Sequence, residues 1–435
     1  MALLIAVCPP FARAGDRPPP PGLPLAQWWS KALDGAVAIG PVSDDVRVYV
    51  ALASAHLTAR AAKDGEEIWR QNRTVTAPMA AAEELLFVAS NDAIEALHGA
   101  TGKTAWTRAR TTPVAPLLAQ AGWLIAVTDT EVIALRAATG EEVWRRQAGG
   151  VKLAPAMDGD RLYTGAADGR VLALNLKDGA IVWEQFLTGG VTAIAAHRGR
   201  VYAGGGDKLF YCLDARKGEA RWKFPLGALA LGHPAVDDER VYVAAINNVV
   251  RALARESGNQ RWKNDEFRQR PSLGVYLAGH VVFVPVPSAE LPMIYDHDGR
   301  SSGVLHLPDE GLPDVLPSIR ETTQGTVVYT VTGNVANEWS LTKFAPAGEA
   351  ALIPFPTLTV TPGVPYLTDP TLAPIGNVLQ TLLLGDPRLL PMADANWPIV
   401  LRDPPLVPLT TLPGVQLRPL SPVPPVRRGA SGPGG

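Results

Sequence analysis

Short apolar runs separated by turn residues recur along most of the chain. The runs RVYVA (47–51), RLYTG (161–165) and VLALN (171–175) are rich in β-branched or aromatic side chains, and Lys-Asp-Gly, Ala-Thr-Gly or Glu-Ser-Gly follows the later run of each unit. Such runs predict strands joined by hairpins in which the glycine supplies a positive φ. Because no amphipathic segment of helical length is visible, the pattern predicts an all-β protein.

The strands belong to a repeat marked by Gly-x-x-x-Trp. The pattern occurs six times, and successive tryptophans are 37, 38, 39, 39 and 40 residues apart. Leucine stands nine residues before each tryptophan except in the first unit, which has Arg60. Four short strands with their links fill such a period, so the repeat predicts the four-stranded blades of a β-propeller. The pairs are Gly65/Trp69, Gly102/Trp106, Gly140/Trp144, Gly179/Trp183, Gly218/Trp222 and Gly258/Trp262.

These tryptophans are predicted to be structural residues that wedge neighbouring blades together. A buried indole removes about 150–250 Å² from water. A row of ligand-stacking tryptophans is the alternative, but a ligand platform does not need one tryptophan in every blade. The stretch TGKTAW (101–106) resembles the end of a phosphate-binding P-loop, yet Leu97 stands where that motif needs glycine. We therefore interpret TGKTAW as a turn and a strand, with Lys103 in solvent.

Two degenerate units are predicted to follow the sixth tryptophan. The seventh runs from Pro271 to about Gly303, with glycine where tryptophan is expected. The eighth covers about 315–350, with Gly348 as its turn. Eight blades result, or seven if residues 300–350 are irregular. The expected first strand of a blade has a proline near its start in four units, at Pro78, Pro116, Pro155 and Pro234.

The segment AQWWSKALDG (26–35) predicts an isolated outer strand near the N-terminus. Trp28 or Trp29 stands in the tryptophan position of the repeat. In closed rings the first strand often completes the last blade, which leaves no open edge. The segment EAALIPF (349–355) competes for the same place.

The units resemble the quinoprotein-like (PQQ-like) β-propeller repeat. Residues 171–183, VLALNLKDGAIVW, closely match the family signature A-L-D-x-x-T-G-x-x-x-W, and the resemblance covers about 25–350. The family includes quinone-dependent alcohol dehydrogenases and the non-catalytic outer-membrane assembly lipoprotein BamB. The resemblance implies the fold, whereas one fold serves many functions.

Composition changes set off both ends of the chain. Residues 1–14 hold an apolar run and Ala12-Arg13-Ala14, which are typical of a signal peptide, although basic residues before the run are missing. Residues 15–24 read as a proline-rich linker. Residues 351–435 contain 18 of the 40 prolines and are expected to form an extended or disordered tail, or to reflect a wrongly placed gene end.

Export would place the protein in the periplasm or outside the cell. Cys8 only weakly resembles a lipid-attachment site, because Val7 is large for the preceding position. No run of 18 apolar residues is present, so no membrane-spanning helix is predicted. The net charge of −2, without a basic stripe, argues against a nucleic-acid partner.

The sequence shows no motif for catalysis, metal binding or cofactor binding. The adjacent cysteines that quinone-dependent dehydrogenases commonly carry are missing, and Cys212 occupies a small core position that is alanine in the other blades. Asp296-His297-Asp298-Gly299 lacks the downstream residues of a calcium loop and is read as a repeat turn. Gly204-Gly205-Gly206 is read as a strand-to-strand link. The histidines lack metal-ligand spacing; they are His56, His98, His197, His233, His280, His297 and His306.

These observations favour a non-catalytic binding or scaffold protein of the bacterial cell envelope. One loop-built face of the ring would bind a protein partner, an envelope or outer-membrane protein, and no cofactor is expected. The alternatives are a PQQ-dependent dehydrogenase-like oxidoreductase and a ligand-sensing propeller module.

Overall fold

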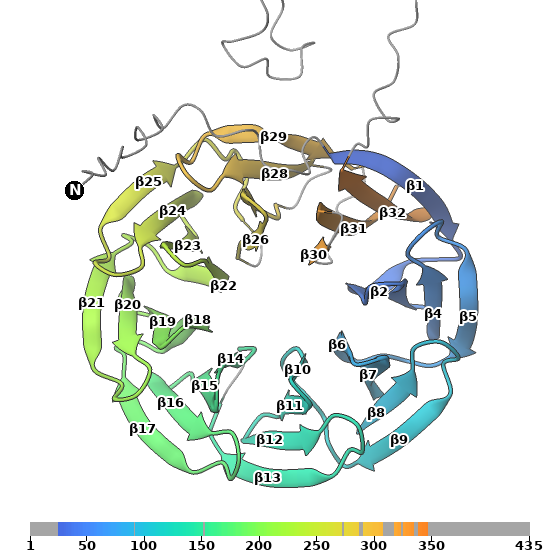
Figure 1. Ribbon diagram of the computed structural model, residues 1–435, viewed down its shortest axis with the longest axis horizontal. Helices are drawn as coiled ribbons and strands as arrows, with labels where there is room; N and C mark the ends of the chain where they lie inside the picture. The colour runs from blue at the N-terminus through green and yellow to red at the C-terminus, as the bar shows by residue number, and fades with distance from the viewer. Residues whose placement is uncertain are drawn as a thin grey trace, which may run out of the picture. The chain divides into compact units, whose positions relative to one another are not determined.

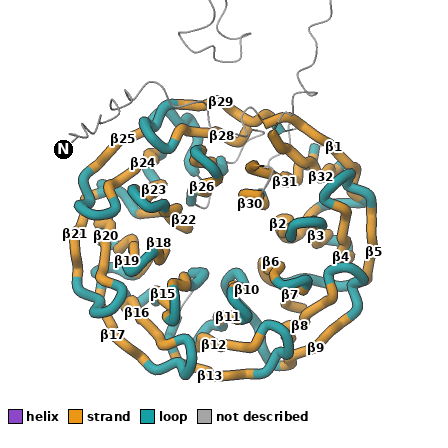
Figure 2. Tube along the Cα trace, viewed as in Figure 1, coloured by secondary structure: helices purple, strands orange, loops and turns teal. Residues whose placement is uncertain are grey.

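The computed structural model describes residues 25–346, apart from 91, 151–152, 272–273, 287–289, 308–316, 323–324 and 335–337. Within these residues the chain forms strands and no helix (Figure 2). The predicted signal peptide (1–14), linker (15–24) and tail (351–435) lie outside the described residues. So do the turn at Gly348 and the competing segment 349–355.

Eight four-stranded antiparallel sheets, or blades, form a closed ring (Figure 1). In each blade the first strand lies nearest the centre and the last strand lies at the rim. The structure therefore confirms the β-propeller and gives it eight blades, not seven.

The strand bounds are given blade by blade. Blades 1 to 4 are β2 (Val37–Ser43), β3 (Arg47–Leu52), β4 (His56–Ala61), β5 (Glu67–Asn72); β6 (Ala77–Ala82), β7 (Leu85–Ser90), β8 (Ala93–His98), β9 (Thr104–Ala109); β10 (Leu118–Gln120), β11 (Trp123–Val127), β12 (Glu131–Arg136), β13 (Glu142–Gln147); and β14 (Ala156–Asp158), β15 (Arg161–Gly165), β16 (Arg170–Asn175), β17 (Ile181–Phe186). Blades 5 to 8 are β18 (Val191–His197), β19 (Arg200–Gly205), β20 (Leu209–Asp214), β21 (Ala220–Pro225); β22 (Ala230–Val236), β23 (Arg240–Ala245), β24 (Val249–Ala254), β25 (Gln260–Asn264); β26 (Tyr276–Ala278), β27 (Val281–Phe283), β28 (Glu290–Tyr295), β29 (Ser301–His306); and β30 (Ser318–Thr322), β31 (Gly325–Gly333), β32 (Trp339–Pro346) and β1 (Leu25–Leu33).

The N-terminal strand closes the ring by completing blade 8. β1 pairs antiparallel with β32, from Leu25 opposite Pro346 to Leu33 opposite Trp339. Trp29, not Trp28, occupies the tryptophan position of the repeat, because its indole packs against Gly65 of blade 1. Trp28 is 48% exposed and donates a 3.2 Å hydrogen bond to Pro346 O.

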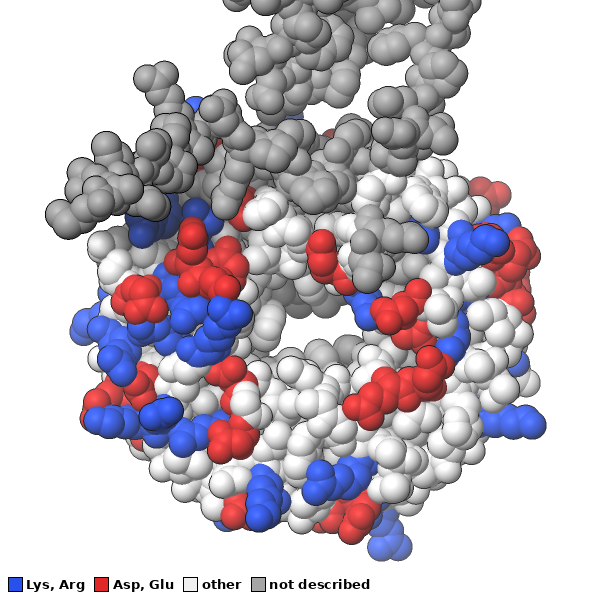
Figure 3. All heavy atoms as spheres, viewed as in Figure 1, with Lys and Arg blue, Asp and Glu red and all other residues white. Residues whose placement is uncertain are grey.

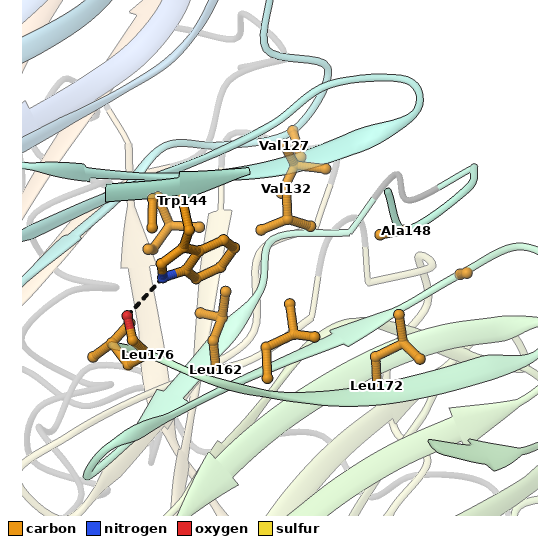
Figure 4. Close-up of a cluster of buried hydrophobic side chains, with 12 residues drawn as sticks. Val127, Val132, Trp144, Ala148, Leu162, Leu172 and Leu176 are labelled. Carbon is orange, nitrogen blue, oxygen red and sulfur yellow. Dashed lines mark hydrogen bonds between the residues drawn. The ribbon is translucent and has the colours of Figure 1, made fainter. Parts of the chain in front are cut away.

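The hydrophobic core lies between the blades. Middle strands such as β3 are buried along their whole length, and their side chains alternate between the two faces of the sheet. One cluster combines Val127, Val132 and Trp144 of blade 3 with Leu162 and Leu172 of blade 4 (Figure 4). Each blade is therefore stabilised by its two neighbours.

A tryptophan–glycine contact, which we term the inter-blade lock, joins consecutive blades. Trp144 Nε1 donates a 2.7 Å hydrogen bond to Leu176 O of the next blade (Figure 4), and its indole lies on Gly179. Gly179 has a φ of 69°, and a Cβ there would come within 2.6 Å of the indole. Glycine is thus required both by the backbone conformation and by the close approach of the ring.

The same lock occurs at six further junctions. In each one the indole N–H donates to the carbonyl three residues before the glycine. The pairs are Trp29 with Gly65, Trp69 with Gly102, Trp106 with Gly140, Trp183 with Gly218, Trp222 with Gly258 and Trp262 with Gly299.

The junction between blades 7 and 8 is built differently. Gly303 of β29 stands in the tryptophan position, and blade 8 has no turn between its last two strands, because β32 and β1 come from opposite ends of the chain. Met293 lies opposite Gly303, where the six complete repeats place alanine or cysteine opposite tryptophan. A larger side chain on β28 thus accompanies the loss of the indole from β29.

Three details differ from, or explain, the sequence pattern. Pro234 lies inside β22 and not near its start; a register shift between Leu231 and Ala235 accommodates the residue that has no N–H. Gly204 and Gly205 lie in β19 and not in a link. Arg60 is buried, and its side chain donates a 3.1 Å hydrogen bond to Gly65 O.

Candidate functional site

Two loop faces flank the ring, and one of them carries most of the tight hairpins. Because each blade is an antiparallel meander, the turns after its first and third strands lie at the same end. We call this end of the ring the hairpin face. The inner strands β10, β14, β18 and β22 lead to it along the central channel (Figure 1).

Acidic side chains connect neighbouring hairpins on this face. Asp158 Oδ2 at the end of β14 accepts a 2.7 Å hydrogen bond from Gly199 N of blade 5. Glu83 Oε1 of blade 2 accepts a 2.8 Å bond from Gly122 N of blade 3. These bonds hold successive turns in register around the mouth of the channel.

The junction without a lock has its own polar connection on the same face. Arg320 of β30 donates to Ser43 O at 2.6 Å and to Asp45 Oδ1 at 2.9 Å. The hydroxyls of Ser43 and Ser318 are 2.9 Å apart. Polar contacts thus join blade 8 to blade 1 in addition to the lock between Trp29 and Gly65.

Asp238 collects basic side chains from blade 5. His197 Nε2 lies 3.2 Å and Arg198 NH1 lies 2.5 Å from Asp238 Oδ1. The hydrogen bond with His197, followed by the charge of Arg198, lowers the pKa of Asp238. Figure 3 shows basic and acidic side chains interspersed over the blades of β18 to β25, and an opening at the centre of the ring.

A pocket of about 360 Å³ lies on the channel wall and spans blades 3 to 6. Its polar side chains come from the inner strands: Gln120 from β10, Asp158 from β14, His197 from β18 and His233 from β22. Its volume is at the small end of the range for ligand sites. The apolar or backbone lining comes from Leu118, Pro155, Ala156, Met157, Gly159 and Ala196.

His233 is the side chain of the pocket with the most altered surroundings. It is accessible from the channel, but the channel walls replace much of its hydration, and this desolvation lowers the pKa of its imidazole. Its backbone is held by Gly274 of the neighbouring segment and by Val275 N, which donates to His233 O at 3.3 Å. The imidazole is therefore a neutral donor and acceptor at neutral pH. The pocket accordingly suits a small polar group more than a large apolar one.

The sequence motifs that suggested chemistry do not meet in this pocket. The repeat glycines and tryptophans lie at the blade junctions, and Lys103 is exposed in its turn. Asp296 is buried in the turn before β29, where its carbonyl accepts from Trp262 and its carboxylate lies 3.0 Å from His280 Nδ1. Cys212 is fully buried, and burial raises the pKa of its thiol to about 11.

Sequence reasoning missed His197 and His233 as neighbours. They appeared only among scattered histidines, 36 residues apart, because the lengths of the inner strands vary from blade to blade. Within the part of the chain that the structure describes, no cluster of three or more His, Cys, Asp or Glu side chains is placed to bind a metal ion. In the same part, no helix is long and apolar enough to cross a membrane.

Comparisons with known proteins agree with the architecture. The family model described as outer membrane protein assembly factor BamB matches residues 26–129, 119–190 and 183–306. No curated protein sequence matches the chain.

Similar solved structures include both binding proteins and enzymes. BamB from Moraxella catarrhalis aligns with a TM-score of 0.59 and 17% identity, over 74% of this chain and 97% of that one. The quinohemoprotein alcohol dehydrogenase ADHIIG from Pseudomonas putida HK5 aligns with a TM-score of 0.60 and 14% identity, over 74% of this chain and 76% of that one. A europium-containing methanol dehydrogenase gives 0.59 and 12%, over 74% and 93%. At such identities the likeness shows the fold alone, whereas the family model spans most of the described ring, and the chain therefore belongs to the BamB-like family of eight-bladed PQQ-like β-propellers.

Proposed function

We propose that this protein is a non-catalytic scaffold of the bacterial cell envelope that binds a protein partner through the hairpin face. The observation that carries the proposal is the rigid presentation of this face. Seven inter-blade locks and the bonds from Asp158 and Glu83 hold the turns in fixed relative positions. A pre-organised surface loses little conformational entropy when a partner binds.

The family supports the same role. BamB of Moraxella catarrhalis shares the architecture, and the matching family model is described as an outer-membrane assembly factor. By this analogy the partner is an envelope or outer-membrane protein, and the protein acts in the periplasm or outside the cell.

Site-specific photo-crosslinking tests the proposal. A photoreactive residue would be introduced at Asp160 or Glu239 on the hairpin face, and at Asn247 on the opposite face as the matched control; all three are exposed. We expect one envelope protein to be captured from both hairpin-face positions and not from Asn247. Capture from Asn247 alone, or from none of the three, would refute the assignment of the face.

A second candidate function is ligand sensing, which the polar pocket at Gln120, Asp158, His197 and His233 favours. A screen of small polar metabolites by thermal shift would support it if the shift is lost in His233→Ala. The enzymatic alternative is tested separately. Incubation with pyrroloquinoline quinone and calcium should produce neither a saturable absorbance change nor alcohol-dependent dye reduction if the protein is not a dehydrogenase.

A further inference from the structure

The rim of blade 4 carries an exposed apolar strand. β17 exposes Ile181, Val182 and Phe186, and Phe186 is 63% exposed. Among the described residues, every other strand contributes at most one exposed large hydrophobic side chain. An apolar edge strand of this kind is normally avoided in soluble proteins, because it invites pairing with another chain.

The corresponding rim strands of the other complete repeats are protected. Lys223 and Lys263 directly follow the tryptophan in blades 5 and 6, and Arg70 and Arg145 do so in blades 1 and 3. Charged residues and prolines on edge strands oppose the addition of a further strand. Blade 4 has Phe186 three residues after its tryptophan, where the other five repeats have Asn72, Ala109, Gln147, Pro225 and Asp265.

The backbone of β17 has a free edge. β17 is the last strand of its sheet, and Leu187 N donates a 2.8 Å hydrogen bond to Gly169 O on the side of β16. Since the lateral direction of the peptide groups alternates along an antiparallel ladder, the groups of Glu184 and Phe186 point away from β16. Gln185 Nε2 donates at 3.3 Å to Phe186 O, a local bond that an incoming N–H can replace. A short stretch, Trp183–Phe186, is thus open to an added strand.

Charge decides what kind of strand fits. Glu184 is exposed between Val182 and Phe186, and it forms no ion pair with the described residues. If a second copy of this chain paired antiparallel with Val182 opposite Phe186, Glu184 would face Glu184, and directly opposed like charges are destabilising. A strand with Lys or Arg opposite Glu184 gains a cross-strand ion pair instead.

We propose that β17 is a docking site for an extended strand of a different protein, which adds to blade 4 with a basic residue opposite Glu184 and apolar residues on either side. Main-chain hydrogen bonds would supply affinity, and the alternating side chains would supply specificity. This surface lies at the rim and is separate from the hairpin face, so the inference stands or falls independently of the function proposed above.

A labelled peptide of sequence Thr-Val-Thr-Lys-Thr-Val-Thr tests the proposal with the full-length protein. We expect saturable binding by fluorescence anisotropy, weaker by about fivefold or more when the central lysine of the peptide is replaced by glutamate. In the Glu184→Lys variant the preference should reverse, so that the glutamate peptide binds better. Phe186→Lys should weaken binding of the lysine peptide about tenfold.

Ala109→Lys, at the equivalent position of blade 2, is the matched control and should bind like the unmodified protein. Circular dichroism and thermal unfolding check that each variant is folded, which the exposure of Glu184 and Phe186 favours. Equal affinity for the two peptides, no binding at millimolar concentration, or an unchanged affinity in Phe186→Lys would overturn the proposal. Self-association of the unmodified protein that Phe186→Lys abolishes would also overturn it, by identifying a second copy as the occupant.

Discussion

Replacing Gly179 by alanine tests the inter-blade lock most directly. The substitution places a Cβ at a φ of 69°, within 2.6 Å of Cδ2 and Cε3 of Trp144. The left-handed backbone costs about 1–2 kcal/mol for a non-glycine residue. Displacing a well-packed ring adds about 1–3 kcal/mol. We therefore expect Gly179→Ala to lower the free energy of unfolding by about 2–5 kcal/mol.

Gly159→Ala separates the two contributions. Gly159 also has a positive φ, 62°, but a Cβ there would meet no atom within 4 Å. Only the backbone cost of about 1–2 kcal/mol should appear in this variant. Equilibrium unfolding in guanidinium chloride measures both variants against the unmodified protein.

A double-mutant cycle with Trp144→Ala completes the test. Once the indole is removed, Gly179→Ala should cost little more than Gly159→Ala, whereas the two single variants would sum to a larger loss if they acted independently. Equal costs of Gly179→Ala and Gly159→Ala in the unmodified background would refute the steric part of the lock. Strict additivity of Gly179→Ala and Trp144→Ala would refute it as well.

Three further predictions concern ring closure and titrating groups. Trp29→Ala should destabilise the ring by about 3–5 kcal/mol in denaturant unfolding, but Trp28→Ala by less than about 1 kcal/mol, because only Trp29 packs on a turn. Cys212 should resist a thiol reagent at pH 8 until the protein unfolds, since burial raises its pKa to about 11; rapid labelling of folded protein would contradict this. Arg221 lowers the pKa of Asp214 to about 2, so the charged carboxylate stabilises the fold above about pH 4 and this contribution is lost as the pH falls to 2. Asp214→Asn should therefore be less stable than the unmodified protein at pH 7, with a difference that shrinks in acid; a constant difference would exclude the ion pair as its cause.

The fold was predictable from the sequence because its signals are local and repeated. Each Gly-x-x-x-Trp unit specifies a hairpin with a left-handed glycine and a large wedge, and six copies at a nearly constant period leave few alternative folds. The candidate pocket was not predictable in the same way. Gln120, Asp158, His197 and His233 stand at no common position of the repeat, since the loops before the inner strands differ in length.

The sequence by itself determined the class of fold, the strands of each blade and the residues that join one blade to the next. These features depend on contacts within a blade or between consecutive blades, which chain order already places side by side. Only the tertiary structure decided that Trp29 and not Trp28 completes the last blade, that eight blades close the ring, and that two histidines meet on the channel wall. Those outcomes depend on the curvature accumulated around the whole ring, which brings together residues that are far apart in the chain. The apolar face of β17 shows the same division: its side chains can be read from the sequence, but their exposure at a free edge is a property of the assembled ring.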